Sequence, residues 1–175
     1  MKRLIVLFMS LCLLTGCTAS AGEIPEAELQ EMITTGDFTD RSQPPALHVT
    51  SRNTYTQGLA GTCSWEWRNT FGIWQAMFRD SMHPLSCRDL LEEMHAGEKE
   101  AVLVFGAVPD QLVVRCWPDS QWGNPDAEPI TIPVDGQTIA LLEGGYIYEV
   151  MARWDKTEYR RFAGRAWYCF YAIAE

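Results

Sequence analysis

The chain has 175 residues, of which 47% are hydrophobic and 11% aromatic, and it carries 23 Asp and Glu against 14 Lys and Arg. This length and apolar content suffice for one domain with a core, and they exclude a wholly disordered chain. The formal net charge of −9 disfavours nucleic acid as a partner, because an acidic surface is repelled by phosphate.

The first residues predict a leader that is removed from the mature protein. Lys2 and Arg3 precede an apolar run from Leu4 to Leu14, which has the length of a signal peptide and falls short of the roughly 20 apolar residues that span a bilayer. Without Lys2 and Arg3, 12 basic residues remain against 23 acidic ones, a formal net charge of −11. Such a surface repels anionic lipid headgroups, so membrane attachment would need a lipid.

The apolar run ends in Leu14-Thr15-Gly16-Cys17, which resembles the lipobox of bacterial lipoproteins. The resemblance implies a signal peptide over residues 1–16, cleavage before Cys17 and lipidation of that cysteine. Two acyl chains make a stable anchor, which places the protein on the outer face of the cytoplasmic membrane. The alternative is secretion without a lipid, by cleavage after the A-x-A-like site Ala19-Ser20-Ala21.

Residues 17–45 are predicted to be a flexible tether, because they are small, acidic and proline-bearing and end in Pro44-Pro45. Residues 46–175 are predicted to form the folded domain. Within it, stretches rich in Val, Ile, Thr and aromatic residues alternate with Gly, Pro, Asn and Asp, which is typical of strands and turns. The expected strands are 47–49, 62–67, 72–78, 101–105, 111–117, 130–134, 138–142, 146–154 and 165–173.

Eight or nine strands at this spacing predict an all-β fold, an Ig-like antiparallel β-sandwich. One short capping helix is expected to interrupt it. Ser86 is a candidate N-cap, Asp89 lies three positions later, Leu90, Leu91 and Met94 form an apolar stripe, and Gly97 ends the segment. This helix would cover an edge or an open end of the sandwich.

Four cysteines lie outside the leader and the lipobox: Cys63, Cys87, Cys116 and Cys169. In an oxidising compartment an even number favours two disulfides, with three pairings open. Reduced buried thiols are a second interpretation. A structural zinc site is a third, but no two of these cysteines have the C-x₂₋₄-C spacing that such a site usually has.

Several segments together resemble a group of small extracytoplasmic domains of Gram-positive, clostridia-like bacteria. The matching residues are Gly61-Thr62-Cys63-Ser64-Trp65, His83-Pro84-Leu85-Ser86-Cys87, Val114-Arg115-Cys116-Trp117, Tyr146-Ile147-Tyr148-Glu149-Val150, Ala152 and Trp154. The resemblance covers roughly residue 46 to the C-terminus and implies fold and location only. Cys63 and Cys169 stand where relatives have other residues, which implies that these two pair with each other and that Cys87 pairs with Cys116.

Two segments contain residue types that occur in catalytic or metal-binding sites. His83 and Cys87 permit a Cys–His nucleophile hypothesis, although catalysis would need a thiolate with a base in reach, and an extracytoplasmic cysteine is more readily explained as oxidised. The acidic loop over residues 118–128 has oxygens for Ca²⁺ but lacks the spacing of a known calcium loop, so a solvated connection is the simpler interpretation. No metal and no cofactor is therefore expected.

The seven tryptophans invite comparison with a carbohydrate-binding platform. Most of them fall inside predicted strands, where a sandwich core needs large side chains. Trp74 and Trp122 are the two that we expect to mark a contact surface, if the protein has one.

The sequence favours a lipid-anchored, extracytoplasmic, non-enzymatic binding or accessory module of the cell envelope. Two alternatives stay open. One is a ligand-sensing domain that works with a membrane protein partner. The other is an envelope-directed hydrolase, although the chain has no P-loop, G-x-S-x-G, H-E-x-x-H or dinucleotide motif.

Overall fold

The computed structural model describes residues 38 and 40–175. The strands are β1 Leu47–Ser51, β2 Thr54–Gln57, β3 Leu59–Arg68, β4 Trp74–Arg79, β5 Glu93–His95, β6 Glu100–Phe105, β7 Gln111–Pro118, β8 Ile130–Ile132, β9 Val134–Asp135, β10 Thr138–Ala140, β11 Gly144–Trp154 and β12 Phe162–Ala174. Three 3₁₀ turns, at Pro84–Ser86, Arg88–Leu90 and Asp119–Gln121, complete the elements. None of the helical turns in this part of the chain is long and apolar enough to cross a membrane.

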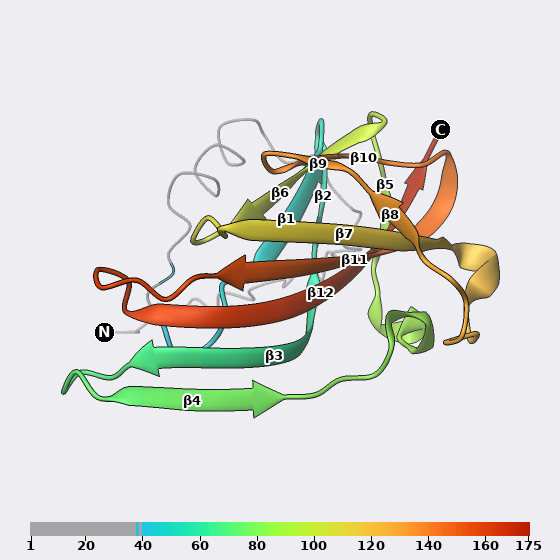
Figure 1. The fold of residues 1–175 in the computed structure, drawn as a ribbon. Coiled ribbons are helices and arrows are strands. Elements are labelled where there is room, and N and C mark those ends of the chain that lie inside the picture. The colour runs from blue at the N-terminus through green and yellow to red at the C-terminus, as the bar shows by residue number, and fades with distance from the viewer. Residues whose placement is uncertain (1–37, 39) are drawn as a thin grey trace, which may run out of the picture.

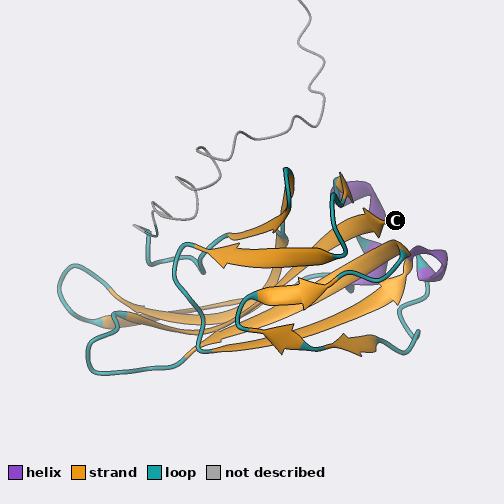
Figure 2. Cartoon of the chain, turned by 90° about the horizontal axis from the view of Figure 1, so that it is seen from above, coloured by secondary structure: helices purple, strands orange, loops and turns teal. Residues whose placement is uncertain are grey.

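The strands form two layers (Figures 1 and 2). One sheet has the order β2-β1-β6-β10-β9, and the other has the order β4-β3-β12-β11-β7-β8 with β5 added to β12. Every pairing is antiparallel except that of β5 with β12. The predicted Ig-like sandwich is thus confirmed at the level of a two-sheet, all-β architecture. The chain passes between the sheets at Pro133, which separates β8 from β9.

The core fills the space between the two sheets. On β11 the side chains of Tyr148, Val150, Ala152 and Trp154 are buried in this core, because successive side chains of a strand point to opposite faces of the sheet. The paired strand β12 contributes its own alternate residues, and the Phe170 ring stacks on the Tyr148 ring at 4.9 Å between centroids. The hydrophobic period of two therefore fixes which face of each long strand is inside.

The predicted capping helix is wrong. Two 3₁₀ turns occupy Pro84–Ser86 and Arg88–Leu90, and β5 follows at Glu93–His95. Met94 is buried, but from a strand that pairs in parallel with Tyr171–Ile173 of β12. Since β12 extends past the end of β3, its free edge offers backbone hydrogen bonds to this segment, and a stripe of three apolar residues is too short to stabilise a helix against them.

The folded unit extends further toward the N-terminus than the predicted boundary at residue 46. The Trp65 indole donates to the Arg41 carbonyl at 2.9 Å, and Phe38 lies edge-on against the rings of Trp65 and Phe162. Tyr168 donates its hydroxyl proton to the Pro45 carbonyl. The predicted signal peptide, Cys17 and most of the predicted tether lie outside the described residues.

Candidate functional site

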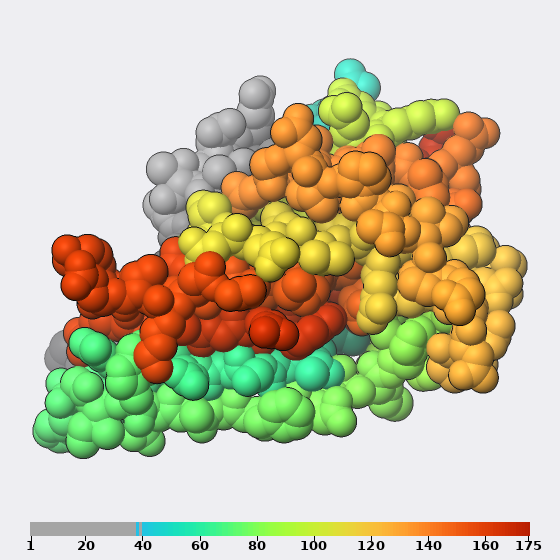
Figure 3. Space-filling view, in the orientation of Figure 1, coloured from blue at the N-terminus to red at the C-terminus, as the bar shows by residue number. Residues whose placement is uncertain are grey.

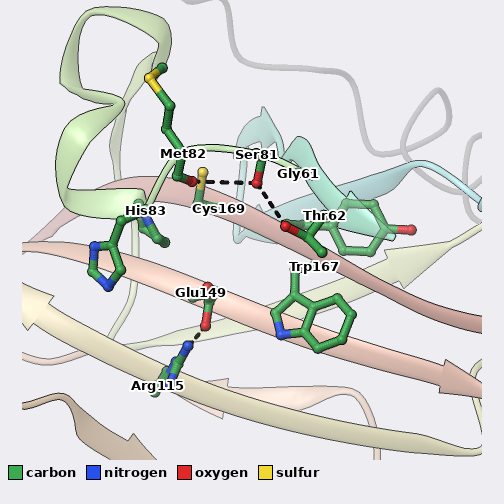
Figure 4. Close-up of a pocket in the computed structure, with 11 residues that line it drawn as sticks. Gly61, Thr62, Ser81, Met82, His83, Arg115, Glu149, Trp167 and Cys169 are labelled. Atoms are coloured by element: carbon green, nitrogen blue, oxygen red, sulfur yellow. Dashed lines mark hydrogen bonds and ion pairs between the residues drawn. The ribbon is translucent and has the colours of Figure 1, made fainter. Parts of the chain in front are cut away.

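A cavity of about 340 Å³ opens on the outer face of the larger sheet, the face turned away from the core (Figures 3 and 4). Its floor consists of side chains from three adjacent strands: Trp167 and Cys169 on β12, Glu149 on β11 and Arg115 on β7. Its rim is the segment from Ser81 to Pro84 that follows β4. The cavity has the size that suits one small ligand, at the lower end of the roughly 300–1,000 Å³ common for such sites.

The polar centre of the floor is an ion pair between Arg115 and Glu149. The two residues are direct cross-strand partners in the β7–β11 register, and the Arg115 Nε donates to Glu149 Oε2. The Glu149 side chain is only 10% exposed, whereas that of Arg115 is 42% exposed. Among the described residues the carboxylate of Glu149 bonds to Arg115 alone, so one carboxylate oxygen has acceptor capacity left for a ligand.

The rim is held to the sheet through hydroxyl groups. Thr62 and Ser81 place their hydroxyl oxygens 3.1 Å apart, and Thr62 also donates to Asp80 at 3.2 Å. A bulge in β3 puts Gly61 directly beneath Ser81, where an added Cβ would lie 2.8 Å from the Ser81 Oγ. The rim approaches the sheet this closely because residue 61 has no side chain.

A second, smaller apolar cluster covers the outer face beside the cavity. Leu85, Trp117 and Ile147 are its buried members, and Trp122 and Tyr171 pack against them. Trp117 donates its indole proton to the Ala127 carbonyl at 2.9 Å, which holds down the loop over residues 118–128. This loop, with its predicted contact residue Trp122, is therefore part of a packed cover, and Trp122 is half-buried.

Trp74, the other predicted contact residue, is also half-buried. It begins the edge strand β4, with the Lys156 ammonium 3.9 Å and the Arg68 guanidinium 5.1 Å from its ring centroid. It is thus not part of the cavity. The structure separates the two tryptophans that the sequence analysis placed in one class.

His83 and Cys87 lie close together without the geometry of a nucleophile and its base. The Cys87 thiol donates to the backbone carbonyl of His83 at 3.4 Å, while His83 Nδ1 accepts the Leu85 N–H at 3.2 Å as the cap of the first 3₁₀ turn. Burial raises the pKa of the Cys87 thiol above its ordinary value. The thiol form is therefore favoured at neutral pH, and the thiolate is the nucleophilic form.

The predicted disulfides Cys87–Cys116 and Cys63–Cys169 are corrected by the structure, in which all four thiols are free and buried. Cys63 and Cys116 belong to the core between the sheets. Cys169 lines the cavity on the outer face, and Cys87 lies near it on the same face. Each predicted pair thus joins thiols on opposite faces of the same sheet, where no disulfide can close. The resemblance from which the pairing was inferred does not show on which face of the sheet each cysteine lies.

Glu149, Arg115 and Trp167 were not singled out by the sequence analysis as site residues. A signal was present: Glu149 and Arg115 each stand between apolar residues in the middle of a predicted strand, and charges there require a partner or a function. Their meeting depends on the β7–β11 register, which joins residues 34 positions apart and has no local signature. Trp167 was assigned to the core, but it lies on the opposite face of β12 and lines the cavity.

The arrangement suits recognition of a small polar molecule that has one apolar face. The indole of Trp167 offers a flat surface, Glu149 an acceptor, and Arg115 with the rim hydroxyls donors. The cavity lining contains one carboxylate, whereas glycoside hydrolysis usually uses two. No protein-family model, curated protein or solved structure matches the chain.

Proposed function

We propose that this protein is a lipid-anchored, extracytoplasmic binding module of the cell envelope and that the cavity on its outer sheet face holds the ligand. Leu14-Thr15-Gly16-Cys17 supports the anchor and the location. The observation that carries the binding function is the Glu149 carboxylate, nearly buried on the floor of an open cavity and bonded to Arg115. Burying a charge is costly, and a stabilising role alone is better served by apolar residues.

The lining favours a ligand with hydroxyl groups around a flat apolar face, as a sugar ring has. Such a ring would stack on Trp167 and donate one hydroxyl to Glu149 while accepting from Arg115. Ser81 and Thr62 lie within the same cavity for further hydroxyl contacts. Envelope polymers are rich in such rings, which is consistent with the proposed location.

Titration with N-acetylglucosamine, chitotriose and soluble peptidoglycan fragments tests this proposal, with intrinsic tryptophan fluorescence and calorimetry as readouts. At least one of these probes should bind saturably, because Trp167 lies in the cavity and reports its occupation. Glu149→Gln should weaken that binding at least tenfold, since an amide replaces a charged acceptor of nearly equal size. Trp167→Ala should abolish it.

Two matched variants control for general effects of these substitutions. Glu128→Gln changes an exposed acid of the 118–128 loop, and Trp74→Ala removes a half-buried tryptophan outside the cavity. Both should bind the probe as the unchanged protein does. Absence of saturable binding up to about 10 mM of every probe would refute the saccharide site.

A further inference from the structure

Three turns lie together at one end of the sandwich, at the left of Figures 1 and 3. They are residues 69–73 between β3 and β4, 106–110 between β6 and β7, and 155–161 between β11 and β12. Backbone hydrogen bonds connect this end: Arg68 N–H to the Arg161 carbonyl at 2.8 Å and Asp110 N–H to the Arg153 carbonyl at 2.8 Å. We call this region the turn end.

Large apolar side chains project into solvent from all three turns. Phe71 is 86% exposed, Ile73 58%, Val108 63% and Tyr159 88%. Single exposed apolar residues are common, but four on three adjacent turns form a group that usually marks an interaction surface.

The turn that carries Phe71 and Ile73 is ordered by its own hydrogen bonds. The side-chain oxygen of Asn69 accepts the N–H groups of both residues at 3.0 Å, and Gly72 adopts a φ of +77° that favours glycine. Arg160 of the third turn pairs with Asp110 of the second. The apolar side chains are thus presented from connected turns, which lowers the entropy lost when a partner covers them.

Charge is segregated along the strands. Six of the twelve Lys and Arg outside the leader lie at the turn end: Arg41, Arg68, Arg153, Lys156, Arg160 and Arg161. Three of them pair with carboxylates, whereas Arg41, Arg68 and Arg161 have no ion-pair partner among the described residues. The segments 88–100, 118–128 and 141–143, which lie away from this end, carry nine Asp and Glu against two Lys and Arg. Five Asp and Glu also lie at the turn end, namely Asp40, Glu66, Asp110, Asp155 and Glu158, so its formal charge is 6 − 5 = +1, against 2 − 9 = −7 in the three distant segments. An anionic surface therefore repels the far end but not the turn end.

The N-terminal segment joins the sandwich at the same end. Phe38 packs against Trp65 and Phe162, and Arg41 lines a surface hollow with Tyr159 and Arg161. The 21 residues from Cys17 to Phe38 span at most about 75 Å when fully extended. A chain anchored at Cys17 would therefore be joined to the membrane through the turn end, which is where the anchored segment enters the domain.

We propose that the turn end is a membrane-contact surface. Phe71, Ile73, Val108 and Tyr159 enter the interfacial layer of a bilayer, and the arginines without carboxylate partners bind the phosphates of anionic phospholipids. Trp74, half-buried beneath Lys156 and Arg68, lies beside this surface, in keeping with the preference of tryptophan for the membrane interface. The net charge of the whole chain does not exclude this contact, because most of the excess of acidic residues lies away from the turn end.

The test uses vesicles and no acyl chain on the protein, so its result does not depend on lipidation. Both sheets and their core lie within residues 38–175, so the chain from residue 17 with Cys17→Ser contains the whole fold. We expect it to cosediment with vesicles of equal phosphatidylglycerol and phosphatidylcholine and to bind pure phosphatidylcholine at least tenfold more weakly. The double variant Phe71→Ser with Tyr159→Ser should lose at least tenfold of the phosphatidylglycerol binding, with unchanged thermal unfolding because both side chains are exposed.

The matched control is Phe78→Ser with Leu90→Ser, which removes two other exposed apolar side chains outside the three turns. This control should bind as the unchanged protein does. Arg41→Gln should weaken binding to phosphatidylglycerol and flatten its dependence on salt. No cosedimentation at 1 mM phosphatidylglycerol, or equal loss in the control and the turn variant, would overturn the proposal. A missing lipid on Cys17 in cells would instead contradict only the proposed anchor.

Discussion

The two faces of the larger sheet are formed by the same strands, but they differ in the kinds of side chain that they carry. On the inner face, alternate residues of β3, β7, β11 and β12 are apolar, and most of them are buried in the core. On the outer face, the same strands carry a packed cover around Trp117, an ion pair in a cavity, and open surface. In the closely packed core, the volume of a side chain determines whether it can be accommodated. On the outer face, each side chain has a different chemical environment. We therefore expect inner substitutions to change stability and outer ones to change binding.

The largest effect should come from an inner substitution, Trp65→Ala. Trp65 is fully buried, lies edge-on to Trp154 at 5.4 Å and stacks on Phe162 at 5.5 Å. Its removal should lower the free energy of unfolding by about 3–5 kcal/mol. Urea unfolding measures this loss, and Trp74→Ala at the edge strand, expected to cost about 1 kcal/mol, is the control. Equal losses in the two variants would contradict the distinction between core and surface.

A second prediction concerns the cysteines, which divide between the faces. Because Cys87 and Cys169 lie near each other on the outer face, oxidation by diamide should join them, with two electrons and two protons passing to diamide. Burial raises the pKa of Cys169 to about 12 and that of Cys116 to about 11, so the reaction should be slow at neutral pH. Cys63 and Cys116 should stay reduced.

Non-reducing peptide mapping identifies the bond. A closed Cys87–Cys169 bridge should raise the free energy of unfolding by about 2–4 kcal/mol, and Cys87→Ser should remove that gain. A mapped Cys63–Cys169 or Cys87–Cys116 peptide from folded protein would show that the facing described here is incorrect.

A smaller effect is expected at the ion pair. Arg115→Met leaves the nearly buried carboxylate of Glu149 without its partner, which should cost about 1–3 kcal/mol of unfolding free energy. The double variant Arg115→Met with Glu149→Met should recover most of this loss, as thermal unfolding can show. Saccharide binding should remain lost in both. Recovery of binding together with stability would contradict a binding role for the pair.

The sequence predicted the inner face better than the outer one. The alternation of Tyr148, Val150 and Ala152 is visible locally, so the long strand β11 was predicted correctly, whereas on β12 Trp167 was expected on the wrong face. The short strands β2 and β5 were missed, because three or four residues show no clear period and form only where a partner edge is available. The helix prediction was wrong for the same reason. The apolar stripe can be recognised in neighbouring residues, whereas the free edge of β12, with which β5 pairs, lies far away in the sequence.

The candidate site was hardly predictable, because it depends on register and facing. Glu149 meets Arg115 only through the β7–β11 pairing, and Trp167 lines the cavity because it lies on the face of β12 opposite the core residues Ala166 and Tyr168. Neither the register nor the facing can be predicted from neighbouring residues in the sequence. The lipidation site at Cys17 is the opposite case, since a modifying enzyme reads it from four consecutive residues, and it remains a prediction.

The position of Glu149 along β11 determines how far the cavity lies from the turn end. Five residues separate Trp154, next to the turn end, from Glu149 on the cavity floor, which corresponds to about 17 Å along a strand. With the turn end resting on a bilayer, the cavity would open about that far above the headgroups, whatever the length of the tether. Lipid headgroups would not reach it, but polymer strands that run parallel to the membrane would pass at its level.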